Sequence, residues 1–325
     1  MEHMMFVGID VAKSSFVAAV SNGSSSSREF SNDLNGFKAF ESWLSLDEGA
    51  PLTVAMESTG RFEEALADFC FSRSWRTFVL DPRRVSLFTR AMHEHKTDAL
   101  DASALALFVQ TFEHSLHPYT PQRPHMRALR ALVKRLAQLS EMIHKEQLRS
   151  LAVKPHEEAY GESLELIIKM LKDEVTRVNL ELDSLIKADD ELAQLNKLLQ
   201  SVPGCGPKLA LAVLAQLHTL SEMSSAKAMT SWLGLAPRQR QSGTSIHAAP
   251  KVQRRRANLL RKTLYMAAVS TLKSKHWEPW LSAQNSNKKG KALVIAIMDK
   301  LARILFGIVK HQRPFDPSLA FSACS

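Results

Sequence analysis

The sequence predicts an α/β layer with a mixed sheet at the N-terminus, followed by a mostly α-helical remainder. Over residues 1–115, short apolar and partly β-branched runs alternate with helix-forming segments, a pattern typical of a sheet covered by helices. Beyond residue 125, leucines recur every three or four residues, which indicates long helices of a coiled-coil kind. Prolines at positions 118, 121 and 124 separate the two patterns and mark a linker.

The individual elements follow from these patterns in chain order. We expect strands at residues 4–9, 15–20, 27–30, 52–56 and 76–80, and helices at residues 35–46, 61–71, 83–91 and 98–112. The first three strands could form a meander. Two leucine-rich helices, one on each side of residues 155–161, would pack as an antiparallel hairpin or pair between subunits. Further helices are expected to end near residue 200 and to cover residues 208–217, 257–273 and 290–310.

Four carboxylates stand out against this pattern. Asp10 and Glu57 each end a short apolar run, so we expect both at the ends of buried strands. Asp98 and Asp101 lie three residues apart in a helix-forming segment, which puts both on one helical face. Convergent carboxylates repel one another unless a hard divalent cation neutralises them, and oxygen ligands suit Mg²⁺ or Mn²⁺. The quartet indicates metal-dependent chemistry on phosphodiesters; the alternative is a set of helix-terminal and turn residues.

Composition restricts the class of protein. A chain of 325 residues is long enough for two or three domains, and 45% hydrophobic with 23% charged residues is typical of a soluble globular protein. No apolar stretch is long enough to span a bilayer, and no export signal is visible. Three cysteines at unrelated positions form neither a disulfide framework nor a zinc spacing. We therefore expect a cytoplasmic protein without a membrane partner.

The net charge of +9 is concentrated in the last third of the chain. From Gly234 onward there are 17 Lys and Arg against three acids, whereas the preceding residues carry a small acidic excess. Nucleic acid is the expected partner, because a membrane-surface helix would need an apolar face that residues 282–291 lack. The clustered basic residues are Arg254, Arg255, Arg256, Arg261, Lys262, Lys288, Lys289 and Lys291.

Two further segments are candidates for contact with phosphate. The glycine-rich segment 202–210 lies between two expected helices and resembles a helix-hairpin-helix element, in which Gly204, Gly206 and Lys208 would bind a phosphate without reading sequence. The alternative is an ordinary tight turn that needs glycine for its backbone angles. Ser242, near several arginines and followed by glycine, is a candidate nucleophile in a flexible loop, although a lone Ser-Gly pair has no value as a motif.

Five motifs in order carry a specific resemblance. They are Gly-Ile-Asp-Val-Ala-Lys at 8–13, Glu-Ser-Thr-Gly at 57–60, Lys-Thr-Asp-Ala-Leu-Asp-Ala at 96–102, Val-Pro-Gly-Cys-Gly at 202–206 and Gly-Leu-Ala-Pro-Arg-Gln-Arg-Gln-Ser-Gly at 234–243. Together they resemble the insertion-sequence-110 family of DEDD transposases, which includes the insertion-sequence-1111 branch and the Piv-type DNA invertases. The resemblance covers essentially the whole chain.

The resemblance implies an organisation and a site. It implies a RuvC-like domain of the RNase H fold at residues 1–117, a helical coiled-coil linker at 118–200 and a transposase domain at 201–325. On the motif match, Asp10, Glu57, Asp98 and Asp101 become the metal-binding quartet, and Ser242 becomes the nucleophile. Relatives of this family pair a structured noncoding RNA with donor and target DNA, and they act as homo-oligomers, here a dimer or tetramer.

The expected reaction follows from joining the two sites. The Ser242 hydroxyl would attack the scissile phosphorus, and Arg238 and Arg240 could neutralise charge in the transition state. Because Ser242 is far along the chain from the acids, we expect a partner subunit to complete the active site. The alternatives are a Piv-type DNA invertase, a structure-specific endonuclease such as a junction resolvase that uses water, and a non-catalytic nucleic-acid-binding protein.

Overall fold

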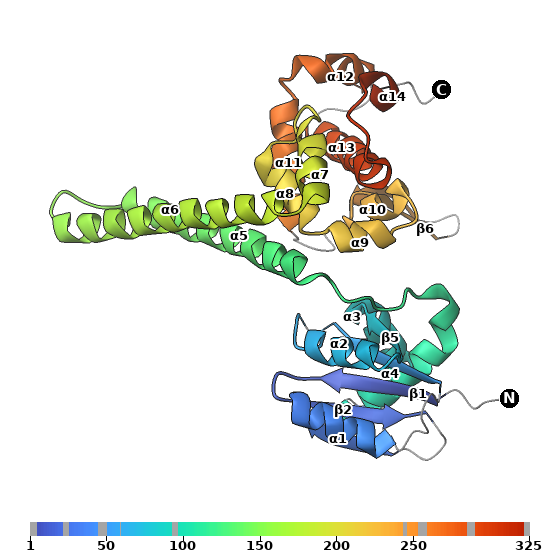
Figure 1. Cartoon of the computed structure of the whole chain (residues 1–325). Helices are drawn as coiled ribbons and strands as arrows, with labels where there is room; N and C mark the ends of the chain where they lie inside the picture. The colour runs from blue at the N-terminus through green and yellow to red at the C-terminus, as the bar shows by residue number, and fades with distance from the viewer. Residues whose placement is uncertain are drawn as a thin grey trace. The chain divides into compact units, whose positions relative to one another are not determined.

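The computed structural model describes residues 5–21, 26–44, 51–58, 60–92, 97–242, 246–252, 259–284 and 290–321. The chain divides into two compact units, Met1–Pro121 and Gln122–Ser325, which are coloured blue to green and green to red in Figure 1. In the described part of the chain, no helix is both long enough and apolar enough to cross a membrane.

The first unit is built on a mixed sheet. Its strands are β1 (Met5–Val11), β2 (Ser15–Val20), β3 (Ser27–Ser31), β4 (Leu52–Glu57) and β5 (Arg76–Leu80), in the order β3-β2-β1-β4-β5. The first three pair antiparallel as a meander, whereas β1, β4 and β5 run parallel. This is the strand order of an RNase H-like sheet, and it confirms the predicted mixed sheet and meander.

Helices cover both faces of this sheet. They are α1 (Leu34–Leu44), α2 (Glu64–Ser72), α3 (Pro82–Met92) and α4 (Asp98–Phe112), followed by the short η1 (Glu113–Ser115). On the face covered by α1 and α2, the core includes Phe16 and Phe40, whose ring centroids lie 5.5 Å apart. On the other face, which α3 and α4 cover, the core includes Ala55, Phe78 and Phe108. Alternate residues of each strand therefore serve different layers, as the period of a strand requires.

The second unit begins with a long helical hairpin, α5 (Pro124–Ser150) and α6 (Glu158–Lys187). The two helices lie side by side and form an arm that extends from the other helices of this unit (Figure 1). Leu129 and Leu139 of α5 are buried in the same core as Val178 and Leu182 of α6. The predicted hairpin within one chain is thus confirmed.

The rest of the second unit is mostly helical. Its helices are α7 (Asp190–Gln200), α8 (Pro207–Leu214), α9 (Leu217–Glu222), α10 (Ala226–Trp232), α11 (Leu259–Thr271), η2 (Lys275–Trp277), α12 (Glu278–Gln284), α13 (Lys291–His311) and α14 (Pro317–Phe321). A series of apolar side chains of α13 is buried, including Ile297, Leu301 and Leu305. Because α13 contacts α7, α9, α10 and α11, it organises the core of this unit.

One prediction in the second unit was wrong. Ser242 was expected in a flexible loop, but residues Pro237–Ser242 form strand β6, which pairs antiparallel with β7 (Ile246–Val252). The residues of β6, Pro-Arg-Gln-Arg-Gln-Ser, show no alternation of apolar and polar side chains. Because that alternation is the usual signal for a strand, the sequence gives no local sign of β6.

Candidate active site

Asp10 and Glu57 occupy neighbouring positions on the sheet. In the parallel pair of β1 and β4, Ile9 lies opposite Met56, and Asp10 and Glu57 are the next residues of their strands. Both carboxylates are partly buried. Because side chains alternate along a strand, both belong to the face of Gly8, which is the face that α4 covers.

Gly8 explains how α4 comes so close to the sheet. A Cβ atom on Gly8 would lie 1.9 Å from the carbonyl oxygen of Ala102 and 2.4 Å from the amide nitrogen of Ala106. Both atoms belong to the backbone of α4 and cannot move aside as a flexible side chain can. Glycine is therefore required at this position of β1.

The direction of α4 brings the second acidic pair to the same end of the sheet. The Ser21 hydroxyl donates to Oε1 of Gln110 at 3.0 Å, and the Ser21 amide donates to the carbonyl of Phe6 at 2.9 Å. The C-terminal end of α4 thus lies beside the start of β1, so the helix runs antiparallel to that strand. Its first turn, with Asp98 and Asp101, must then lie at the end of β1 where Asp10 is found.

The start of α4 is fixed by a cap. Thr97 has an extended backbone, and its hydroxyl oxygen accepts a hydrogen bond from the Leu100 amide at 3.3 Å. A capping threonine of this kind satisfies one of the free amides of the first turn. The cap sets the register of Asp98 and Asp101 relative to the sheet.

The donor set of these four residues fits a hard divalent cation, because all the donors are carboxylate oxygens. Their elements bring them to one end of the sheet. Among the residues that the structure describes, however, no three His, Cys, Asp or Glu side chains lie close enough together to hold a metal ion. In the described part of the chain, the four acids therefore lie toward one end of the sheet but do not form a closed ligand cage.

A buried carboxylate supports the loop that follows Glu57. Glu63 is only 6% exposed, and it accepts hydrogen bonds from the Ser58 hydroxyl at 3.0 Å and from the Arg61 amide at 2.9 Å. Arg61 has a φ of 125°, which an L-residue rarely adopts without support from its surroundings. Glu63 thus fixes the backbone directly after a candidate metal ligand.

Asn32 joins two segments of the same site. Its Nδ2 donates to the carbonyl of Ala12 at 2.9 Å, just after β1, and to the carbonyl of Phe62 at 3.0 Å, in the loop after β4. Neither Asn32 nor Glu63 was predicted from the sequence. Their role depends on contacts between distant segments, and a Ser-Asn-Asp turn or a helix-flanking glutamate has no distinctive local pattern.

The serine-bearing strand can be described by its backbone. Ser242 is the last residue of β6 and pairs with Ile246, Arg240 pairs with Ala248, and Arg238 pairs with Lys251. A shift of register lies between Arg238 and Arg240. Such bulges redirect side chains and are frequent next to active sites.

Arg261 contacts the backbone of its own chain. It is half-buried in the first turn of α11, and its Nη1 donates to the carbonyl of Leu233 at 2.6 Å and to that of Gly234 at 3.0 Å. By contrast, the neighbouring Lys262 and the more distant Lys208 and Lys291 are exposed. Arg254, Arg255, Arg256, Lys288 and Lys289 fall outside the described residues.

The glycine-rich segment forms a tight turn between α7 and α8. Gly204 has a φ of 97°, and a Cβ there would lie 2.5 Å from Oγ1 of Thr271. Nε1 of Trp277 donates to the carbonyl of Pro203 at 2.8 Å, and burial raises the pKa of the Cys205 thiol to about 12. Gly206, just before α8, is exposed with open space around it. The turn is packed against Thr271 and Trp277 on one side and is open to solvent at Gly206.

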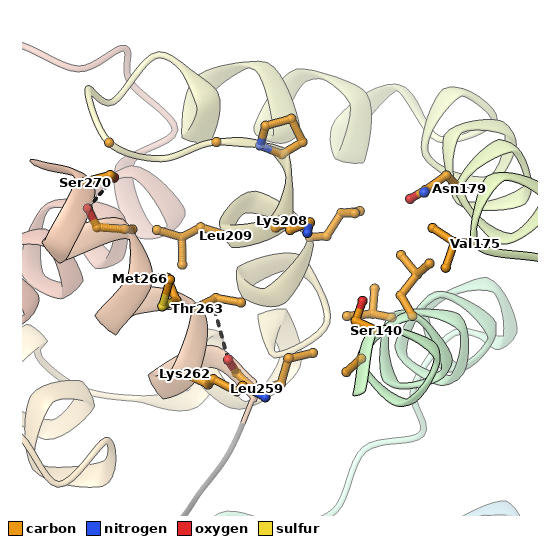
Figure 2. Close-up of a pocket in the computed structure, with 18 residues that line it drawn as sticks. Ser140, Val175, Asn179, Lys208, Leu209, Leu259, Lys262, Thr263, Met266 and Ser270 are labelled. Carbon is orange, nitrogen blue, oxygen red and sulfur yellow. Dashed lines mark hydrogen bonds between the residues drawn. The ribbon is translucent and has the colours of Figure 1, made fainter. Parts of the chain in front are cut away.

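A pocket of about 810 Å³ lies beside this turn, and Figure 2 shows the residues that line it. Its walls come from the arm helices α5 and α6, from the turn with α8, and from α11. Four of the predicted phosphate-binding residues line it together: Gly204, Gly206, Lys208 and Lys262. Val175, Leu209 and Met266 give it an apolar floor, whereas Ser140 and Asn179 add polar groups from the arm. Four segments of the chain, from Val133 in the first to Ser270 in the last, thus meet at one pocket.

Similarity to known proteins places this chain among DNA phosphoryl-transfer enzymes of the transposase class. Residues 7–153 match the model of the DEDD transposases of IS110, described as "Transposase". Residues 196–284 match a second model, described as "Transposase IS116/IS110/IS902 family". The chain belongs to the IS110 family of DEDD transposases.

Several named proteins resemble this chain. The pilin gene-inverting proteins of Moraxella bovis and Moraxella lacunata are each 28% identical over 318 residues, which cover 96% of this chain and 97% of each relative. A probable family 20 transposase of Pseudomonas aeruginosa is 24% identical over 163 residues, or 46% of this chain and 47% of that protein. The relatives of this chain therefore include proteins named for DNA inversion as well as a probable transposase.

Proposed function

We propose that this protein is a site-specific DNA recombinase in which Ser242 is the nucleophile and a divalent cation assists. The observation that carries the proposal is the convergence of Asp10, Glu57, Asp98 and Asp101 at one end of β1 and β4. A match to transposase models both there and around Ser242 supports it.

The four carboxylates would hold Mg²⁺ or Mn²⁺. When bound, the cation would polarise the scissile phosphodiester and neutralise charge on its oxygens. The protein's own part is to hold these carboxylates on two adjacent strands and one helix. Glu63 and Asn32 would keep the loops beside them in place.

The Ser242 oxygen would form a bond to the scissile phosphorus as the bond from phosphorus to the 3′ oxygen breaks. The serine proton passes to solvent, and the departing oxygen takes up a proton to become a 3′-hydroxyl. The phosphoserine link keeps the energy of the phosphodiester, so a different 3′-hydroxyl can reverse the step without ATP. Arg238 and Arg240, on the same strand, would stabilise the negative charge of the transition state.

The basic residues would bind donor and target DNA, and also a noncoding guide RNA, through phosphates. Lys208 and Lys262 line one pocket with Gly204 and Gly206, which suits contact with the backbone of a strand. The other proposed contacts are Arg254, Arg255, Arg256, Lys288, Lys289 and Lys291. The division that we propose is a RuvC-like domain at 1–117, a coiled-coil linker at 118–200 and a transposase domain at 201–325, with a helix-hairpin-helix-like turn.

We also propose that the protein works as a dimer or tetramer whose partner subunit completes the active site. The arm supports this proposal because it exposes large apolar side chains, including Leu148, Leu166 and Met170, each more than half exposed. Exposed apolar surface on a helical arm is typical of a protein–protein interface. A strictly monomeric preparation that is catalytically active would rule out this arrangement.

The test is recovery of covalently attached DNA from cells that carry the gene with its native flanking DNA. The protein is pulled down under denaturing conditions, and the wild type is compared with Ser242→Ala and Asp10→Ala. Adducts in the wild type and none in either variant would support the proposal. Metal-dependent cleavage that survives Ser242→Ala without any adduct would instead identify an endonuclease that uses water, such as a junction resolvase.

A DNA invertase is a second candidate function, favoured by the similarity to two pilin gene-inverting proteins along 96% of this chain. The same chemistry serves both functions, so the products distinguish them. Sequencing of the flanking DNA would show inverted segments for an invertase and new insertion sites for a transposase.

A further inference from the structure

Arg261 makes a contact that the proposed reaction does not yet explain. Its Nη1 donates to two successive backbone carbonyls, that of Leu233 at 2.6 Å and that of Gly234 at 3.0 Å. Leu233 is 1% exposed, and Gly234 has a φ of 68°. Hydrogen bonds from a charged donor are stronger than those between neutral groups. The guanidinium therefore anchors this bend in the chain.

The bend lies directly before the serine-bearing strand. Gly234 precedes β6, whereas Arg261 follows β7, and the two strands pair from Pro237 opposite Val252 to Ser242 opposite Ile246. The contact thus joins the segments that enter and leave the hairpin. It lies at the base of the hairpin, and Ser242 lies toward the other end.

Other bonds hold the same base from the side of α10. The Gly234 amide donates to the carbonyl of Ser231 at 2.9 Å, and the Leu235 amide donates to that of Thr230 at 2.8 Å. Leu235 is buried. These bonds fix the bend relative to α10, and Arg261 adds the connection to α11.

We infer that Arg261 is a positioning residue for Ser242 rather than a contact with nucleic acid. The inference rests on the proposed function of Ser242. A six-residue strand is about 20 Å long, so a tilt of about 3° at its base moves its far end by about 1 Å. A displacement of about 1 Å at a reacting group can cost on the order of 10²-fold in rate.

The inference is tested with Arg261→Lys, which keeps the positive charge but loses the planar guanidinium. Full-length protein is assayed on its flanking DNA for DNA affinity, for adduct rate at saturating DNA and for melting temperature. We expect the adduct rate to fall about 10- to 100-fold, with DNA affinity changed less than about twofold and the melting temperature within a few degrees of the wild type. The matched control is Arg303→Lys, at an exposed ion pair with Asp299 on α13, which should change none of the three.

If Arg261 contacted nucleic acid, the variant would instead lower the DNA affinity and leave the adduct rate at saturating DNA unchanged. Lys262→Ala serves as the reference for such a contact and should weaken DNA binding and reduce its salt dependence. If Arg261→Lys resembles Lys262→Ala, with lower affinity and a normal rate at saturating DNA, the inference is wrong. If Arg261→Lys does not fold, Gly234→Ala disturbs the same contact from the other side without changing any charge, and the same loss of rate is expected.

Backbone hydrogen exchange separates failure of the inference from failure of the proposed function. Without DNA, Arg261→Lys should increase exchange at the amides of β6 and β7 relative to those of α13. This readout needs no catalytic activity, so it holds even if the wild type forms no adduct. Unchanged exchange in the hairpin would overturn the inference, whereas absence of an adduct in the wild type would overturn only the serine mechanism.

Discussion

A single added methyl group is expected to have a large effect at Gly8. Gly8→Ala would place a methyl group 1.9 Å from a backbone oxygen of α4, so the helix must move away from the sheet. Overpacking of this kind costs about 1–3 kcal/mol, and a clash with backbone lies at or above the upper end. We expect a lower melting temperature for the first unit in calorimetry, together with loss of any activity that needs Asp98 and Asp101 beside Asp10.

Gly307→Ala is expected to raise the stability, in contrast to Gly8→Ala. Gly307 lies inside α13, with open space where a Cβ would be added. Alanine in a helix interior is favoured over glycine by about 1 kcal/mol, so this variant should be more stable than the wild type. Equal losses of stability in both variants would contradict the close approach at Gly8.

The stability of the protein is expected to depend on pH through the carboxyl group of Asp33. Hydrogen bonds from the Gly36 amide, then from the Ser31 hydroxyl, hold the pKa of its carboxyl below the usual value of 3.8. Because the pKa is lowered on folding, the stabilisation is present above pH 3.8 and is lost as the pH falls through the lowered value. Asp33→Ala should therefore be less stable than the wild type at pH 6, and the difference should shrink toward pH 3. Denaturant titrations across this range would check it; a constant difference would exclude the charge as its cause.

At the scale of elements, the glycine-rich turn depends on a helix far along the chain. Trp277 is fully buried and donates to the carbonyl of Pro203. Trp277→Phe removes this bond and leaves space beside the turn, at an expected cost of about 2–3 kcal/mol. Binding of DNA should weaken as well, because the turn that carries Gly204 loses support. Trp280→Phe, at a partly exposed ring beside Trp277, is the control and should cost less in both urea denaturation and DNA binding.

The elements of the first unit could be predicted from the sequence within a few residues, because each buried strand carries a continuous apolar run. The leucine-rich hairpin could be predicted as well, since the spacing of its leucines repeats over many turns. Strand β6 could not be predicted, because every residue after Pro237 in Pro-Arg-Gln-Arg-Gln-Ser is polar and because its pairing depends on β7. A pattern in one segment cannot reveal a partner in another.

Some features of the candidate site could likewise be predicted from the sequence, and others could not. Asp10, Glu57, Asp98 and Asp101 could be selected because each has a recognisable place at a strand end or a helix start. Arg261 was assigned to nucleic acid because it lies in a basic cluster. Its contacts with Leu233 and Gly234 arise only when folding brings the segment after α10 beside α11. Charge alone does not distinguish a surface cation from one that binds carbonyls.

At the scale of the whole molecule, the charge distribution predicts how binding responds to salt. The basic excess after Gly234 should make the affinity for DNA fall steeply as salt rises, because each contact with a phosphate releases counterions. Lys208→Ala should reduce the slope of log K against log salt by about 1. Lys169→Ala, a change in the arm at a residue that does not line the same pocket as Lys208, should leave the slope unchanged. Equal slopes for all three proteins would argue against a phosphate at Lys208.

The contact between β1 and α4 also bears on the timing of synthesis. Gly8 leaves the ribosome almost a hundred residues before Ala102 and Ala106, which cover it. Domains fold as units once their chain is available. A nascent chain that has not yet released α4 therefore holds Asp10 and Glu57 without Asp98 and Asp101. Whatever chemistry the four acids perform is withheld until the first unit has been made in full.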